Sequence, residues 1–222
     1  SRVISDKERN IVAFHEAGHV VVGLMLDDAE IVHKVTIVPR GQAGGYAVML
    51  PKEDRYFMTK PELLDKIAGL LGGRVAEEVV LGEVSTGAHN DFQRATGIAR
   101  SMVTEYGMSD KLGPMQFGQA QGGNVFLGRD FNSEQNYSDS IAYEIDQEMQ
   151  SIIKDQYERT RQILTENRNL LDLIATTLLE VETLDAEQIN HLKDHGTLPE
   201  RSYEQNGNDN IKVEEKSAES DK

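Results

Sequence analysis

The sequence has 222 residues, of which 38% are hydrophobic, enough for one substantial domain with a packed core. It contains no cysteine, which excludes disulfides and thiolate metal sites, so a metal would have to bind His, Asp or Glu. The formal net charge of -15 disfavours a nucleic-acid surface, because binding phosphates requires clustered Lys and Arg.

The first predicted elements are a helix and a β-hairpin. Ser5 and Glu8 form an S-x-x-E capping box before an apolar run at helical spacing, which predicts a helix over residues 6–26. Two runs rich in β-branched and apolar residues follow at 31–38 and 46–50, separated by a proline and a glycine-rich stretch. This pattern predicts two antiparallel strands joined by a turn.

Two more helices are predicted in the middle of the sequence. The first begins with the capping pair Thr59 and Glu62 and runs to about Leu81. The second opens at Asp91 and ends near Tyr106, before a glycine that can adopt the left-handed cap. Each glycine inside a helix weakens it by about 1 kcal/mol. We therefore expect another backbone to approach the first of these helices closely at its three glycines, Gly69, Gly72 and Gly73.

The C-terminal half is predicted to be helical. Beyond a flexible connection at 118–128, a long amphipathic helix is indicated by apolar residues at every third or fourth position, and shorter helices are expected at about 168–180 and 186–193. The apolar positions of the long helix are Tyr137, Ile141, Ile145, Met149 and Ile152. Acidic residues dominate this half, which is typical of a solvated helical surface.

These elements predict a mainly α-helical fold with a small β-sheet or hairpin. We place a soft boundary near residue 130, so that residues 1–130 form one part, residues 131–200 form a helical subdomain of the same domain, and the polar residues 201–222 form a disordered tail. No run approaches the roughly 18 apolar residues that cross a bilayer, so we expect this piece to be soluble. Its start, without Met or a signal core, indicates an excised or processed chain.

The residues that indicate chemistry are His15, Glu16 and His19, which form an H-E-x-x-H motif within the first predicted helix. Residues four apart lie on one face of a helix, so both imidazoles can reach one metal ion. Glu16 projects about 100° away from His15 around the helix axis, which suits a base beside a metal-bound water better than a ligand. A pair of structural histidines is the alternative reading of this motif.

A catalytic zinc site needs a third protein ligand, and three downstream residues are candidates. Glu77 is helical, Asp91 stands at the start of its helix, and His89 precedes it by two positions. Each has a simpler alternative: Asp91 could cap its helix, Glu77 could pair with a surface base, and His89 could be a solvated loop residue. Chemistry alone leaves the choice open.

The sequence resembles the FtsH family of membrane-anchored, ATP-dependent zinc metalloproteases. The resemblance covers residues 1 to about 200 and includes, besides the histidine motif, five blocks in the order of the family: TIVPRG at 36–41, GGRVAEE at 72–78, STGAHND at 85–91, MVTEYGMS at 102–109 and VFLGR at 125–129. It implies that residues 1–130 are the zinc-binding catalytic part of a mostly helical peptidase domain.

The resemblance also implies a set of site residues and partners. Asp91 occupies the position of the family's metal-binding aspartate, so His15, His19 and Asp91 would bind one Zn²⁺ per subunit and Glu16 would act in catalysis. Glu77 would orient one of the ligand histidines. The full-length protein would be a homo-hexamer at the bacterial cell membrane, with this domain facing the cytoplasm beneath an ATPase ring. No G-x-x-x-x-G-K-[ST] loop occurs, so the ATPase and the membrane anchor would lie upstream, outside this sequence.

We therefore expect a zinc endopeptidase that hydrolyses unfolded polypeptides. The main alternative is a catalytically silent hexamerisation module in which zinc only braces the fold. A zinc hydrolase of small molecules is a further alternative, and it would leave a protein substrate such as casein intact.

Overall fold

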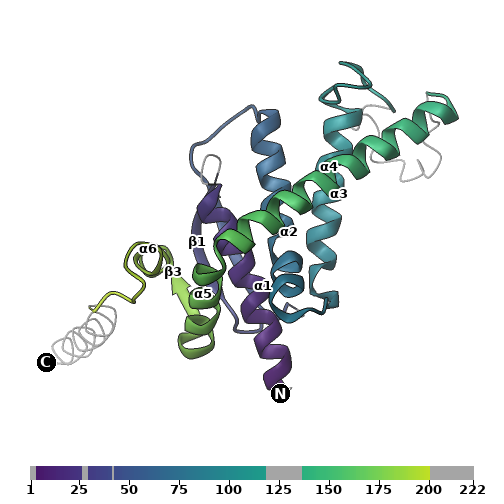
Figure 1. Cartoon of the computed structure of the whole chain (residues 1–222). Helices are drawn as coiled ribbons and strands as arrows, with labels where there is room; N and C mark the ends of the chain where they lie inside the picture. Colours follow the sequence, from purple (N-terminus) through teal and green to yellow (C-terminus); the bar gives the residue numbers. More distant parts are fainter. Residues whose placement is uncertain (1–3, 27–29, 42, 119–136, 201–222) are drawn as a thin grey trace, which may run out of the picture.

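The computed structural model describes residues 4–26, 30–41, 43–118 and 137–200. Their elements follow one another along the chain as shown in Figure 1: α1 (Asp6–Met25), β1 (Glu30–Thr36), β2 (Tyr46–Pro51), α2 (Lys60–Leu81), the short 3₁₀ helix η1 (Thr86–Ala88), α3 (His89–Thr104), α4 (Asp139–Glu166), α5 (Arg168–Val181), β3 (Thr183–Asp185) and α6 (Ala186–His195). The expected mainly helical fold with a small sheet is confirmed.

The capping residues read from the sequence begin the first two long helices. The Ser5 side chain accepts a hydrogen bond from the backbone of Glu8, and Thr59 with Glu62 forms a complete capping box. Gly82 ends α2 in the left-handed conformation. These local bonds satisfy backbone N–H groups that would otherwise lack partners at the helix start.

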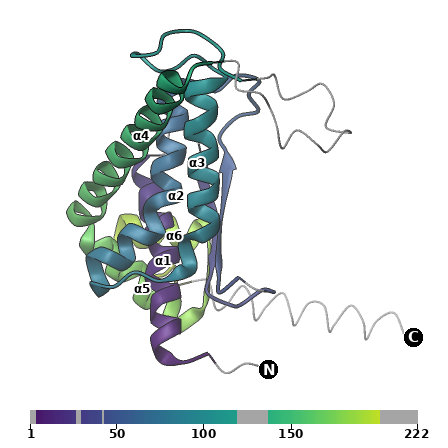
Figure 2. The same ribbon diagram turned by 90° about the vertical axis from the view of Figure 1, so that its right-hand side faces the viewer.

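Helix α2 packs against α1, α3 and α4, and in the view of Figure 2 it lies between α4 and α3. The long α4 contacts both α2 and α3 and passes diagonally across them in Figure 1. Between α1 and α2 the backbones approach closely, because a Cβ on Gly18 would lie 2.3 Å from the carbonyl oxygen of Gly72. The expected close approach is therefore confirmed at Gly72. At Gly73 the neighbour is the His15 ring instead of a backbone, and at Gly69 nothing lies within 4 Å.

The sheet has three strands in the order β2-β1-β3, all antiparallel. The predicted hairpin is confirmed as β1 and β2, with a register shift between Val32 and Lys34. The strand β3 was not predicted. It pairs with the other side of β1, where the hydroxyl groups of Thr36 and Thr183 are hydrogen-bonded at 2.7 Å. This leaves β2 as one edge of the sheet within the described part of the chain.

The main hydrophobic core joins the two halves of the sequence. Its buried residues include Val20 and Val21 of α1 as well as Leu164, Leu171 and Ile174 of the C-terminal helices. The boundary expected near residue 130, the connection at 118–128, the block at 125–129 and the tail over 201–222 fall largely or wholly outside the described residues. Across that boundary, α5 packs directly on α1.

The start of α3 differs from its predicted position. The helix begins at His89, with Ala88 as the residue before it, so Asp91 lies within the first turn and does not cap it. The end at Thr104, followed by Gly107 with a φ of +60°, is close to the expected one. Of the helices in the described part, none is long and apolar enough to cross a membrane.

We predict that Gly18→Ala destabilises the metal-free protein by about 2 kcal/mol, because the new methyl group would overlap the carbonyl oxygen of Gly72. Urea unfolding in the presence of a chelator measures the change. Gly97→Ala in α3 is the matched control, since nothing lies within 4 Å of the place that its new Cβ would take. It should stabilise the protein by about 0.5–1 kcal/mol through helix propensity. Equal stability of both variants would contradict the close packing.

Candidate metal centre

The two histidines of the motif lie in the middle of α1 and are both buried. Their side chains face α2 and α3, and their Nε2 atoms are 3.1 Å apart. The rings meet edge to face, with centroids 4.8 Å apart. The helical spacing of four residues thus brings two imidazole nitrogens to the same point.

A carboxylate from the first turn of α3 completes the cluster. Oδ2 of Asp91 lies 3.2 Å from Nε2 of His15 and 3.2 Å from Nε2 of His19. One ligand atom from each residue falls within 4.8 Å of the others, which marks this group as able to hold a metal ion. Ligands at zinc distances in a tetrahedral arrangement are about 3.3 Å apart, close to the observed separations.

The other ring nitrogen of each histidine is already bonded. Nδ1 of His15 donates to Oε2 of Glu77 at 2.7 Å, and Nδ1 of His19 donates to the carbonyl oxygen of Gly69 at 2.8 Å. A carbonyl oxygen can only accept, so Nδ1 of His19 must carry its proton, and the lone pair is left on Nε2. When both rings are neutral, two nitrogen lone pairs and a carboxylate oxygen face one another, an arrangement that suits a metal cation.

The charges of the cluster are strongly coupled. Burial opposes the charged form of His15, yet its hydrogen bonds to Asp91 and Glu77 raise its pKa to about 9. Burial likewise opposes the ionised form of Asp91, but its bonds to His15 and His19 hold its pKa well below the usual range. A protonated His15 ring therefore balances part of the negative charge of Asp91 and Glu77.

Glu16 follows His15 on α1 and is buried as well. Burial raises the pKa of its carboxyl group, although His19 and His15 act in the opposite direction. A carboxylate with a raised pKa accepts a proton more readily than an exposed one. Glu16 has no place in the group of three ligand atoms, which agrees with a role beside the metal.

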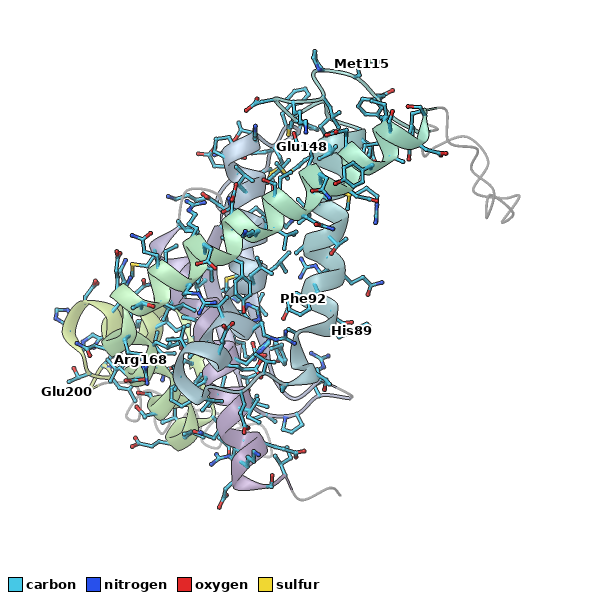
Figure 3. All side chains as sticks on the ribbon, turned by 45° about the vertical axis from the view of Figure 1, so that its right-hand side comes forward. His89, Phe92, Met115, Glu148, Arg168 and Glu200 are labelled. Carbon is cyan, nitrogen blue, oxygen red and sulfur yellow. The ribbon has the colours of Figure 1, made fainter. Side chains whose placement is uncertain are left out.

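The structure separates the three candidates for the third ligand. Asp91 meets both histidines, whereas His89 is exposed at the start of α3 (Figure 3) and is not part of the cluster. Glu77 is buried and touches the site, but on the Nδ1 side of His15. Its second oxygen accepts the backbone N–H of Ser85 at 3.0 Å. The alternative in which Glu77 pairs with a base at the surface is therefore wrong, because its side chain is buried.

Two hydrogen bonds that support the site could not be predicted from the sequence. The carbonyl oxygen of Gly69 and the backbone of Ser85 orient site residues through main-chain atoms, which any residue type carries. The sequence feature that does relate to the site is the glycine at position 73. A Cβ there would lie 2.4 Å from Nε2 of His15, so the ring fits only against a glycine.

Two imidazoles one turn apart, a carboxylate from a second helix and a buried glutamate beside them define the class of H-E-x-x-H metallopeptidases. The chain belongs to peptidase family M41, whose family model matches residues 2–192. It is 78% identical to the ATP-dependent zinc metalloprotease FtsH of Bacillus subtilis (strain 168) over 96% of its own length and 34% of that protein. It is 70% identical to the protein of that name from Staphylococcus haemolyticus (strain JCSC1435), over 92% of this chain and 28% of that protein. The chain thus spans about a third of the length of these relatives.

We predict that Asp91→Ala weakens zinc binding far more than Glu77→Gln. The first change removes an atom at the convergence point, whereas the second leaves an amide oxygen that can still accept the Nδ1 proton of His15. We expect a loss of about 10-fold for Glu77→Gln and at least 100-fold for Asp91→Ala. Competition with a chromogenic chelator measures both, and an equal loss of zinc from the two variants would contradict the assignment.

Proposed function

We propose that this chain is the zinc-dependent peptidase part of an ATP-dependent protease and that it hydrolyses peptide bonds of unfolded polypeptides. The observation that carries the proposal is the convergence of His15, His19 and Asp91 beside the buried Glu16. The names of the relatives, which are ATP-dependent zinc metalloproteases, support it.

In this proposal His15, His19 and Asp91 would hold one Zn²⁺. When bound, the ion would lower the pKa of a water molecule and polarise the scissile carbonyl group. Glu16 accepts the proton of the attacking water and returns it to the departing amine. Burial of the glutamate favours the first of these steps, because it raises the proton affinity of the carboxylate.

Glu77 and Gly69 fix the histidine rings for this chemistry. By accepting the Nδ1 protons, they leave Nε2 of both rings free to bind the metal, and they stop the rings from turning. Burial opposes ionisation of Glu77, but its bonds to His15 and Ser85 lower its pKa, so it remains a carboxylate that accepts.

The assembly belongs to the same proposal. We infer that the full-length protein is a homo-hexamer anchored at the bacterial membrane, with this part facing the cytoplasm and receiving chains from an ATPase ring. The support is the high identity to FtsH proteins, of which the chain covers about a third. The remaining two thirds of those relatives leave room for the motor and the anchor.

An extended substrate could bind along β2. The strand lies beside α1, since a Cβ on Gly45, just before the strand, would lie 2.9 Å from Val12, and a Cβ on Gly23 of α1 would lie 3.3 Å from Met49. It therefore runs past the turn that carries the histidines, and its outer edge is unpaired within the described residues. A peptide added to this edge would be held by main-chain hydrogen bonds, which give little dependence on side-chain identity.

The decisive variant is Glu16→Gln. We expect it to keep zinc binding and the fold while lowering casein hydrolysis by a factor of about 10² to 10⁴, because the amide cannot accept the proton of water. Glu8→Gln, which alters an exposed residue of the same helix, is the control and should retain activity. Wild-type protein that binds zinc but never cleaves casein would favour the silent module or a small-molecule hydrolase.

If the substrate binds as an added strand on β2, the effect of backbone methylation on cleavage should alternate from one substrate residue to the next. In a set of otherwise identical fluorogenic peptides, methylating a backbone nitrogen that faces β2 should lower kcat/KM about fivefold or more, because one ladder hydrogen bond is lost. Methylating the next nitrogen, which faces away, should have little effect and serves as the control. Cleavage that depends strictly on one side-chain type and ignores methylation would exclude β2 as the docking edge.

A further inference from the structure

Arg74 is a half-buried cation that lies one turn from Glu77 on α2 and reaches across to the loop before α3. Its Nη2 donates to the carbonyl oxygen of Ser85 at 2.8 Å. The backbone N–H of Ser85 in turn donates to Glu77, which accepts Nδ1–H of His15. A continuous set of hydrogen bonds therefore runs from Arg74 to a predicted metal ligand.

The same guanidinium contacts the start of α3. Its central carbon lies 4.6 Å from the centroid of the Phe92 ring, within the range of a cation–π contact. Phe92 directly follows Asp91 and lies in the first turn of α3, near His89 (Figure 3). Arg74 thus touches both the loop that holds Glu77 and the helix turn that carries Asp91.

An ion pair does not explain why an arginine occupies this position. Among the residues that the structure describes, no carboxylate forms a salt bridge with Arg74, and its buried Nε makes no hydrogen bond. The carboxylate of Glu78 acts on Arg74 only at longer range, so the direct contacts of this half-buried charge are a backbone carbonyl and an aromatic ring, and its burial is costly. What these two contacts gain is a fixed distance between α2, the loop at Ser85 and the first turn of α3.

We propose that Arg74 is a positioning residue for the metal centre, which sets the place of Asp91 through Phe92 and the orientation of His15 through Ser85 and Glu77. The proposal rests on the proposed function, since it assumes that these residues bind zinc. A planar guanidinium is required, because a lysine can donate to Ser85 but cannot lie flat on the ring.

The test replaces Arg74 by Met and by Lys and uses Arg161→Met as a matched control. Arg161 also lies against an aromatic ring, that of Tyr157 at 5.5 Å, and it bonds Glu78, the neighbour of Glu77, but it has no contact with the site. Zinc affinity is measured by chelator competition, and Co²⁺-substituted protein reports ligand geometry through its visible absorption spectrum.

We expect Arg74→Met to weaken zinc binding about 10- to 100-fold and to alter the Co²⁺ spectrum. Arg74→Lys should lose less, because it keeps the bond to Ser85. With saturating zinc, kcat for an unfolded substrate should fall while KM stays constant. Arg161→Met should lower the melting temperature without changing zinc affinity or spectrum.

The possible outcomes distinguish a failure of the proposed function from a failure of the role proposed for Arg74. If wild-type protein binds no zinc, the proposed function itself fails. If wild-type protein binds zinc and cleaves casein, but Arg74→Lys and any folded Arg74→Met keep zinc affinity within about twofold and an unchanged Co²⁺ spectrum, the role of Arg74 is overturned. Equal effects of Arg74→Met and Arg161→Met on zinc affinity would also overturn it, since they would indicate general loosening.

Discussion

The close contact between α1 and α2 is the constraint on which the site depends. Gly18 faces Gly72 with backbone atoms so near that a Cβ at either position would collide. On one side of this crossing the His15 ring lies on Gly73, and on the other side His19 bonds the carbonyl oxygen of Gly69. The antiparallel packing of α1 on α2 therefore also sets the orientation of both histidine rings. A larger residue at the crossing would move the rings away from the atoms that fix them.

The imidazole ring explains why Glu77 supports the site without joining it. The two nitrogens of a histidine point in different directions, so a group bonded to Nδ1 cannot also reach an ion at Nε2. Glu77 lies on the Nδ1 side of His15, and Asp91 lies on the Nε2 side. Both residues are acidic, but only Asp91 lies where the Nε2 atoms of the two histidines meet, whereas Glu77 bonds the opposite nitrogen of His15. This difference arises because α2 and α3 approach the His15 ring from different sides.

Local signals account for what the sequence predicted, and long-range packing accounts for what it did not. The spacing of His15 and His19 and the capping pair Thr59 and Glu62 act within one or two helical turns, so they can be read directly. The strand β3 has three residues and exists because it pairs with β1, with Thr36 and Thr183 separated by 147 positions. No local sequence pattern predicts this strand. The choice among Asp91, His89 and Glu77 also depended on how α3 packs, and the resemblance to a family, not the chemistry of the residues, favoured Asp91.

The core and the metal centre are held by different forces, and this bears on how metal and fold are coupled. The largest apolar cluster joins α1 to residues such as Leu171 and Ile174 of α5 and needs no cation. The cluster of His15, His19, Asp91 and Glu16 buries polar groups whose charges must be balanced. Burial opposes the charged form of His15, but its hydrogen bonds to Asp91 and Glu77 raise its pKa, so a protonated ring can balance part of their negative charge. The helices that carry His15, His19 and Asp91 are held to α2 by apolar contacts that do not involve these polar groups. The geometry of the cluster therefore follows from the packing of the helices around it.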